Sequence, residues 1–293
     1  MAVIASAGMG DLEHARFDVG ELSLHAVSAG PATGPVVVLL HGFPEFWYSW
    51  RRQIPALVAA GFRVVAPDLR GYNLSDRPLG VSNYRLEKLA ADIAGLIAAV
   101  SPGKKVRLVG HDWGGGIAWA MGHWHPELID RLVVLNAPHP AILKPALLSP
   151  SMAARVWHFF FFQLPYLPER AILGRDFLHH ALRGLSRKKE AAFSDAEIAE
   201  YAVALHKPGA ATAMLNYYRA MKAAVGLELT GKIAADTLLI WGDKDKALPP
   251  FLTEGTDRQV AGKLRIEHLA EASHWVHHDE PDKVNELLIE FFK

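Results

Sequence analysis

The sequence VRLVGHDWGGG, residues Val106–Gly116, joins a short apolar run to a helical pattern that begins at Ile117. A charged residue, Asp112, stands at the junction between small residues. This small-x-nucleophile-x-small form is typical of a nucleophile elbow, a strained turn between a strand and a helix. Side chains at positions 110 and 114 would collide with the neighbouring strand and helix. We therefore expect Asp112 to project from the top of a sheet. A plain strand-to-helix turn with an Asp N-cap is the alternative.

Similar apolar runs lie on both sides of the elbow and alternate with helical patterns. This alternation indicates βα units on a largely parallel sheet, so the fold class is α/β. Helices are predicted at Trp47–Ala60 and Tyr84–Val100. The predicted strands are Leu22–Val27, Val36–Leu40, Phe62–Ala66, Val106–Val109, Leu132–Leu135, Thr237–Trp241 and Leu264–Leu269.

The strand pattern is interrupted in the middle of the chain. From about residue 141 to about residue 226 the sequence has helical spacing, and the strand pattern returns at Thr237. Because the interruption falls inside one sheet, it predicts an insertion rather than a second domain. We expect a helical cap, residues 141–226, inserted in a core of residues 1–140 and 227–293.

The composition indicates a compact protein without a nucleic-acid partner. Of the 293 residues, 51% are hydrophobic and 21% are charged, which is enough apolar material for a sizeable core. Lys and Arg number 31, as do Asp and Glu, so no basic field exists for phosphate backbones. Cysteine is absent, which excludes thiolate nucleophiles. Any nucleophile is therefore oxygen or nitrogen.

No cofactor and no metal is predicted. Three histidine pairs match no zinc-site pattern, and we expect solvated surface residues at His123 and His125, His179 and His180, and His277 and His278. The first ten residues lack Lys and Arg, unlike a signal peptide. The densest apolar stretch, Val156–Leu167, is too short for a membrane span of about 20 residues. We therefore expect a cytoplasmic protein with no membrane span. Its oligomeric state stays open.

Two motifs downstream of the elbow complete the order nucleophile, acid, histidine. The run TLLIWG is followed by Asp243 and Asp245, and the run LRIEHLA is followed by His274. Each motif lies just beyond the carboxyl end of a predicted strand. An acid must hold the imidazole in the right tautomer, and we select Asp245 because it lies deeper in its loop than Asp243.

An oxyanion hole is predicted beside the elbow. The strand Val36–Leu40 leads into Phe43, and Trp113 follows Asp112. The backbone amides of Phe43 and Trp113 both lie at strand ends that face Asp112, so we expect them to stabilise a developing oxyanion.

Segments along nearly the whole predicted core resemble those of a known family. The segments HGFPEFWYSWR, APDLRGYNLSDRP, VGHDWGGG, VVLNAPHP, WGDKDKALP and SHW resemble those of epoxide hydrolases with the α/β-hydrolase fold. The resemblance implies that fold, with Asp112 as nucleophile, His274 as base and Asp245 as the acid that orients it.

A carboxylate nucleophile favours attack on saturated carbon rather than on a carbonyl group. The expected reaction opens an epoxide to form an alkyl ester of Asp112, and water activated by His274 then hydrolyses the ester to a vicinal diol. The expected partners are therefore a small apolar substrate that bears an epoxide, and water.

The ring oxygen of an opening epoxide needs a hydrogen-bond donor from the cap. The segment LNYYR resembles the cap motif of epoxide hydrolases, and Tyr218 is the matching position. Where the family usually has a second tyrosine this chain has His158, which is expected to donate an N–H group instead. Trp113, Phe43 and Phe159 are predicted to line an apolar substrate pocket.

Two other functions stay open. A haloalkane-type dehalogenase shares the HDWG motif and would use Trp113 as halide donor, but Phe43 stands where its pattern has Asn. A non-catalytic ligand-binding protein is the less favoured alternative, because none of the three triad residues is missing. Fluoroacetate dehalogenases place arginines where Trp113 and Gly116 stand here, so an anionic substrate is disfavoured.

Overall fold

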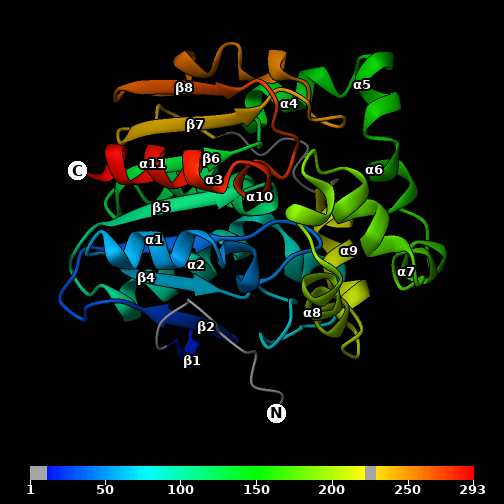
Figure 1. Cartoon of the computed structure of the whole chain (residues 1–293), viewed down its shortest axis with the longest axis horizontal. Helices are drawn as coiled ribbons and strands as arrows, with labels where there is room; N and C mark the ends of the chain where they lie inside the picture. The colour runs from blue at the N-terminus through cyan, green and yellow to red at the C-terminus, as the bar shows by residue number, and fades with distance from the viewer. Residues whose placement is uncertain (1–11, 222–228) are drawn as a thin grey trace.

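The structure, a computed structural model, describes residues 12–221 and 229–293. The predicted cap boundary at residues 226 and 227 therefore lies outside the described residues. A sheet of eight strands in the order β1-β2-β4-β3-β5-β6-β7-β8 forms the centre, as Figure 1 shows. The pairs β1–β2 and β2–β4 are antiparallel and the remaining pairs are parallel, so the predicted α/β class is confirmed. The strands are β1 (Glu13–Asp18), β2 (Ser23–Ala29), β3 (Val36–Leu40), β4 (Arg63–Pro67), β5 (Val106–His111), β6 (Ile129–Leu135), β7 (Asp236–Gly242) and β8 (Leu264–Leu269).

All seven predicted strands are present, with ends that differ by a few residues at most. Strand β1 is absent from the predicted strands, because its sequence EHARFD is largely polar. It lies at the edge of the sheet, pairs only with β2 and is mostly exposed. An exposed edge strand carries little of the hydrophobic pattern on which strand prediction depends.

Helices cover both faces of the sheet. Helix α1 (Gln53–Ala59) packs against α11 (Pro281–Phe292) on one face, and α2 (Leu86–Val100) packs against α3 (Trp113–Trp124) on the other. The predicted helix Trp47–Ala60 is wrong in its first half, where Trp47–Trp50 forms a separate 3-10 turn. Pro55 explains the break, because proline fits in the first turn of a helix and not further along it.

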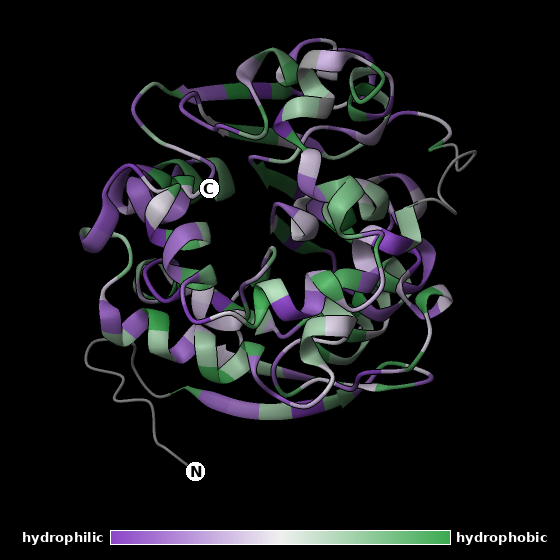
Figure 2. Ribbon diagram, turned by 90° about the vertical axis from the view of Figure 1, so that its right-hand side faces the viewer, coloured by the Kyte–Doolittle hydropathy of each residue, from purple (hydrophilic) through white to green (hydrophobic). Residues whose placement is uncertain are grey.

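The helical insertion between β6 and β7 lies beyond the carboxyl ends of the parallel strands (Figure 1). Seen from that side, its helices carry both hydrophobic and hydrophilic residues (Figure 2). Ligands of open parallel sheets bind at this edge, so the insertion covers the edge where the predicted catalytic residues lie. Its helices are α4 (Pro140–Ala146), α5 (Pro150–Arg155), α6 (Trp157–Phe161), α7 (Leu167–Ile172), α8 (Asp195–Leu205) and α9 (Ala210–Ala220).

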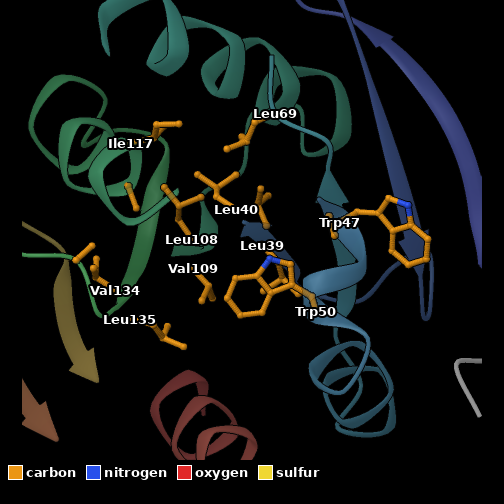
Figure 3. Packing of buried hydrophobic residues seen from close by; sticks show 14 of the residues in the cluster. Leu39, Leu40, Trp47, Trp50, Leu69, Leu108, Val109, Ile117, Val134 and Leu135 are labelled. Carbon is orange, nitrogen blue, oxygen red and sulfur yellow. The ribbon is translucent and has the colours of Figure 1, made fainter. Parts of the chain in front are cut away.

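The central strands are buried on both faces. All residues of β3 are buried, and Leu39 and Leu40 belong to one hydrophobic core with Val109 of β5 and Val134 of β6 (Figure 3). Near-continuous apolar runs of this kind are typical of parallel strands covered by helices. The strands that end at the predicted site therefore form a rigid platform. No helix among the described residues is both long enough and apolar enough to cross a membrane.

Candidate active site

Asp112 lies at the junction of β5 and α3 in a strained backbone conformation. Its φ angle is +50°, which lies in a backbone region that residues other than glycine rarely adopt. The flanking glycines are required by close packing. A Cβ atom on Gly110 would lie 2.2 Å from the carbonyl oxygen of Gly114, and one on Gly114 would lie 2.2 Å from that of Leu40. The elbow predicted from the sequence is therefore present, and its glycines have the predicted steric reason.

The structure brings the three predicted triad residues together. The Nδ1 atom of His274 lies 2.7 Å from Oδ2 of Asp245, and its Nε2 atom lies 3.5 Å from Oδ2 of Asp112. Asn136, which follows β6, donates a 3.0 Å hydrogen bond to the same oxygen of Asp245. The imidazole is thus held between two carboxylates, with one ring nitrogen facing each.

In the loop that follows β7, the surroundings of the two acids favour Asp245 over Asp243 as the partner of His274. Asp245 is buried, and its Oδ1 atom accepts hydrogen bonds of 2.9 Å from the amides of both Ala247 and Leu248. Asp243 instead lies 2.6 Å from Nδ1 of the exposed His268. Asp245 is therefore the acid that contacts the site, and Asp243 belongs to a surface pair.

One of the two predicted oxyanion-hole amides contacts the nucleophile directly. The amide of Phe43 donates a 2.8 Å hydrogen bond to Oδ1 of Asp112. The loop approaches this closely because Gly42 has no side chain, since a Cβ atom there would lie 2.5 Å from Cβ of Asp112. The amide of Trp113 lies at the first position of α3, and its part in the oxyanion hole stays a prediction.

The charges of the site favour an ionised Asp112. Burial alone would raise the pKa of Asp112, but the hydrogen bond and charge of His274, the charge of His111 and the Phe43 amide together lower it. Burial opposes the charged form of His274, yet Asp245 and Asp112 raise its pKa well above the usual value. The loss of the Asp112 charge would therefore lower the pKa of His274.

The two predicted cap donors lie close to each other at the nucleophile. Tyr218 of α9 is buried, and its ring makes edge contacts with Trp113, Phe43 and His158 at centroid distances of 5.1, 5.3 and 6.1 Å. The neighbouring Tyr217 instead donates its hydroxyl to the backbone, so its phenol group is already paired. The charge of Asp112 acts on Tyr218, whereas Tyr217, whose hydroxyl is already paired, lines the cavity beside Asp112.

The pKa shifts of Tyr218 and His158 both favour the uncharged side chain near neutral pH. Burial, with the charge of Asp112, raises the pKa of Tyr218 well above its usual value. Burial also lowers the pKa of His158 to about 4, although the charge of Asp112 opposes this shift. A phenol O–H group and an uncharged imidazole therefore stand beside the carboxylate.

An apolar cavity of about 640 Å³ opens at Asp112. Trp113 and Phe159 line it, as predicted, but Phe43 is not among its lining residues. The ring of Phe43 packs instead against Phe162 and Tyr218, while its backbone amide is bonded to Asp112. The remaining walls come mainly from α4, from the end of α9 and from residues 229–231.

The prediction of solvated histidines is wrong for His277 and His278, which are fully buried. The physical reason is a buried carboxylate. Glu45 lies 2.8 Å from Nε2 of His278, 3.1 Å from Nδ1 of His111 and accepts a 2.7 Å hydrogen bond from Ser49. Burial would raise the pKa of Glu45, but the hydrogen bonds of His111 and His278 lower it well below its usual value.

This cluster lies next to the loop that carries His274. Nε2 of His111 lies 2.9 Å from the backbone oxygen of His274, so the cluster helps to hold the histidine loop in place. Glu45, His111 and His277 present possible metal-ligand atoms within 4.8 Å of one another, but the oxygens of Glu45 already have hydrogen-bond partners. Glu45 and Asn136 are absent from the predicted site residues, although they stand in the segments HGFPEFWYSWR and VVLNAPHP that carry the family resemblance.

Comparison with known proteins agrees with this fold. A family model described as "alpha/beta hydrolase fold" matches residues 35–281. The chain is 42% identical to the AB hydrolase superfamily protein YfhM of Bacillus subtilis (strain 168), over 93% of this chain and 95% of that protein. It is 36% identical to epoxide hydrolase 4 of Homo sapiens, over 100% of this chain and 82% of that protein. Among solved structures, epoxide hydrolase A of Mycobacterium thermoresistibile superposes with a TM-score of 0.84 at 28% identity, covering 96% of this chain and 98% of that one.

The chain therefore belongs to the α/β-hydrolase fold family, and it is a hydrolase of the epoxide hydrolase type.

Proposed function

We propose that the protein opens an epoxide to a vicinal diol through an alkyl ester of Asp112. The observation that carries the proposal is the division of this carboxylate between two partners. Its Oδ1 atom is bonded to the amide of Phe43, and its Oδ2 atom lies 3.5 Å from Nε2 of His274. In this proposal the helical insertion is a cap, residues 141–226, that supplies Tyr218 and His158 to a core of residues 1–140 and 227–293.

In the first step Oδ2 of Asp112 attacks one epoxide carbon, and the bond from that carbon to the ring oxygen breaks. The ring oxygen takes a proton from Tyr218 while the N–H group of His158 donates a hydrogen bond to it. Because neutral imidazole is a far weaker acid than phenol, Tyr218 is the proton donor and His158 orients the oxygen. The product of this step is an ester of Asp112 and a tyrosinate.

In the second step neutral His274 takes a proton from water, and the hydroxide adds to the carboxyl carbon of Asp112. The charge that develops on Oδ1 is stabilised by the amides of Phe43 and Trp113. Esterification has already removed the charge of Asp112, which is one of the groups that raise the pKa of His274. The pKa of His274 therefore falls, and this favours the neutral imidazole that this step needs. Cleavage of the ester bond releases the diol, and the proton on His274 passes to the departing oxygen. The second proton of the attacking water, left on the carboxyl group of Asp112, returns to the tyrosinate of Tyr218, which restores the starting carboxylate and phenol.

The proposal is tested by trapping the ester. In His274→Gln, alkylation proceeds but water is not activated, so incubation with styrene oxide should leave a covalent adduct on the peptide that contains Asp112. Asp112→Asn is the matched control and should show no adduct. Diol formation by the wild type without any adduct in His274→Gln would contradict the proposal.

The same assay separates the dehalogenase alternative. The wild type should form diol from styrene oxide and from 1,2-epoxybutane, whose apolar substituents match the mostly apolar walls of the cavity. Halide release from 1-bromobutane, with no diol from either epoxide, would instead support a dehalogenase that uses the same nucleophile.

A further inference from the structure

Four glycines surround the elbow, and three of them are required by packing. A Cβ atom on Gly110 or Gly114 would lie 2.2 Å from a backbone oxygen, and one on Gly115 would lie 2.4 Å from Cβ of Ala137. A Cβ atom on Gly116 would meet no atom within 4 Å. The fourth glycine is therefore not explained by packing.

The backbone does not explain Gly116 either. It lies in helix α3, and its amide donates a 2.9 Å hydrogen bond to the carbonyl oxygen of Asp112. Its φ angle is not in the left-handed region that favours glycine. Glycine within a helix costs about 1 kcal/mol relative to alanine. A glycine here lowers stability without a structural gain, which suggests that the empty space itself is useful.

That empty space belongs to the cavity at the nucleophile. Gly116 lines the cavity together with Asp112, which lies four residues earlier and so on the same face of the helical turn. Leu143 and Leu147 contribute to the same cavity, as does Met221 after α9. A group bound over Gly116 would therefore lie one helical turn from the reacting carboxylate, in a cavity whose lining is mostly apolar and includes Lys144 and Thr230 as polar members.

We propose that Gly116 is a specificity-determining residue, and that the space over it receives an extended apolar substituent of the epoxide. This inference rests on the proposed function and deepens it, because it names the substrate class as epoxides with a long apolar chain rather than only small ones. The volume of about 640 Å³ is within the range of sites that enclose whole organic ligands, about 300–1,000 Å³.

The test fills the space in steps and compares two terminal epoxides that differ only in chain length. Gly116→Ala and Gly116→Leu introduce two of the strongest helix formers, so neither should disturb α3. The probes are 1,2-epoxybutane and 1,2-epoxydodecane. We expect the ratio of kcat/KM for the long probe to that for the short probe to fall at least about tenfold in Gly116→Leu. Gly116→Ala should give a smaller fall in the same direction.

Thermal unfolding of both variants shows whether the fold is retained, and Gly116→Ala keeps the test valid if Gly116→Leu does not fold. A ratio that stays at the wild-type value in a folded variant would overturn the inference, as would a parallel loss on both probes. If the wild type forms no diol from either probe, the proposed function itself is contradicted and this inference falls with it.

Discussion

The backbone amide of Phe43 donates a 2.8 Å hydrogen bond to Oδ1 of Asp112, which makes the two oxygens of this carboxylate different. Oδ1 is fixed by a backbone donor, whereas Oδ2 lies on the side of His274, 3.5 Å from its Nε2 atom. A fixed donor at Oδ1 stabilises charge there when the ester is hydrolysed. In the proposed reaction Oδ2 is the oxygen that forms the ester bond.

Asp245→Asn should block ester hydrolysis while leaving alkylation measurable. An amide nitrogen facing Nδ1 of His274 favours the wrong tautomer, and a comparable change in a serine protease triad costs about 10⁴-fold in kcat. We expect a loss of about 10³-fold or more in turnover, with the ester accumulating in rapid-quench mass spectrometry.

Asp243→Asn is the matched control, because Asp243 lies in the same loop but pairs with the exposed His268. Its turnover should stay within about twofold of the wild type. Equal losses in the two variants would show that the loop, and not the contact between Asp245 and His274, matters.

Tyr218→Phe should slow ring opening rather than ester hydrolysis. The change removes the proton donor but keeps the ring that packs on Trp113 and Phe43. Loss of a general acid costs about 10²- to 10⁴-fold, so single-turnover alkylation should slow by that factor with no build-up of ester. An accumulated ester in this variant would place Tyr218 in the second step instead.

Gly114→Ala and Gly116→Ala should change stability in opposite directions. A methyl group on Gly114 would overlap the carbonyl oxygen of Leu40, whereas one on Gly116 meets open space. We expect Gly114→Ala to lose about 3 kcal/mol or more in unfolding free energy and Gly116→Ala to gain up to about 1 kcal/mol. Urea denaturation measures both, and a similar loss in the two variants would contradict the packing described for α3.

Acid should destabilise the protein between pH 6.5 and about 4. Burial lowers the pKa of His278 and of His158 to about 4 and that of His139 to about 3, from an ordinary value of 6.5. In this range the unfolded chain binds protons that the folded chain does not, so stability rises with pH. The contribution is present above pH 6.5 and is lost as the pH falls.

The dependence of unfolding free energy on pH in His278→Gln tests this linkage. Removing one such histidine should lower the slope by about 1.4 kcal/mol per pH unit in this range. The matched control is His179→Gln, because His179 is exposed and its imidazole meets water in both states. An unchanged slope in His278→Gln would contradict the burial of this histidine.

The sequence predicts those features that depend on local pattern. Parallel strands buried on both faces appear as apolar runs, and the elbow glycines are recognisable because their spacing follows from close contacts. The order of Asp112, Asp245 and His274 is readable for the same reason, since each follows the end of a strand.

Features that depend on distant partners are not readable in this way. His278 is buried because of Glu45, which stands 233 positions earlier in the chain, and neither residue carries a local signal of that contact. The edge strand β1 escapes prediction because it pairs with a neighbour without burying much apolar surface. The packing of the Phe43 ring also depends on cap residues that lie far away in sequence.

The most direct test of the central claim follows the oxygen of water through one turnover. With enzyme in excess over styrene oxide in H₂¹⁸O, the proposed ester predicts an unlabelled diol, because its second oxygen comes from Asp112. The label should instead appear in the peptide that contains Asp112. A diol that carries ¹⁸O after the first turnover, with an unlabelled peptide, would mean that water attacks the epoxide directly and would contradict the nucleophilic role of Asp112.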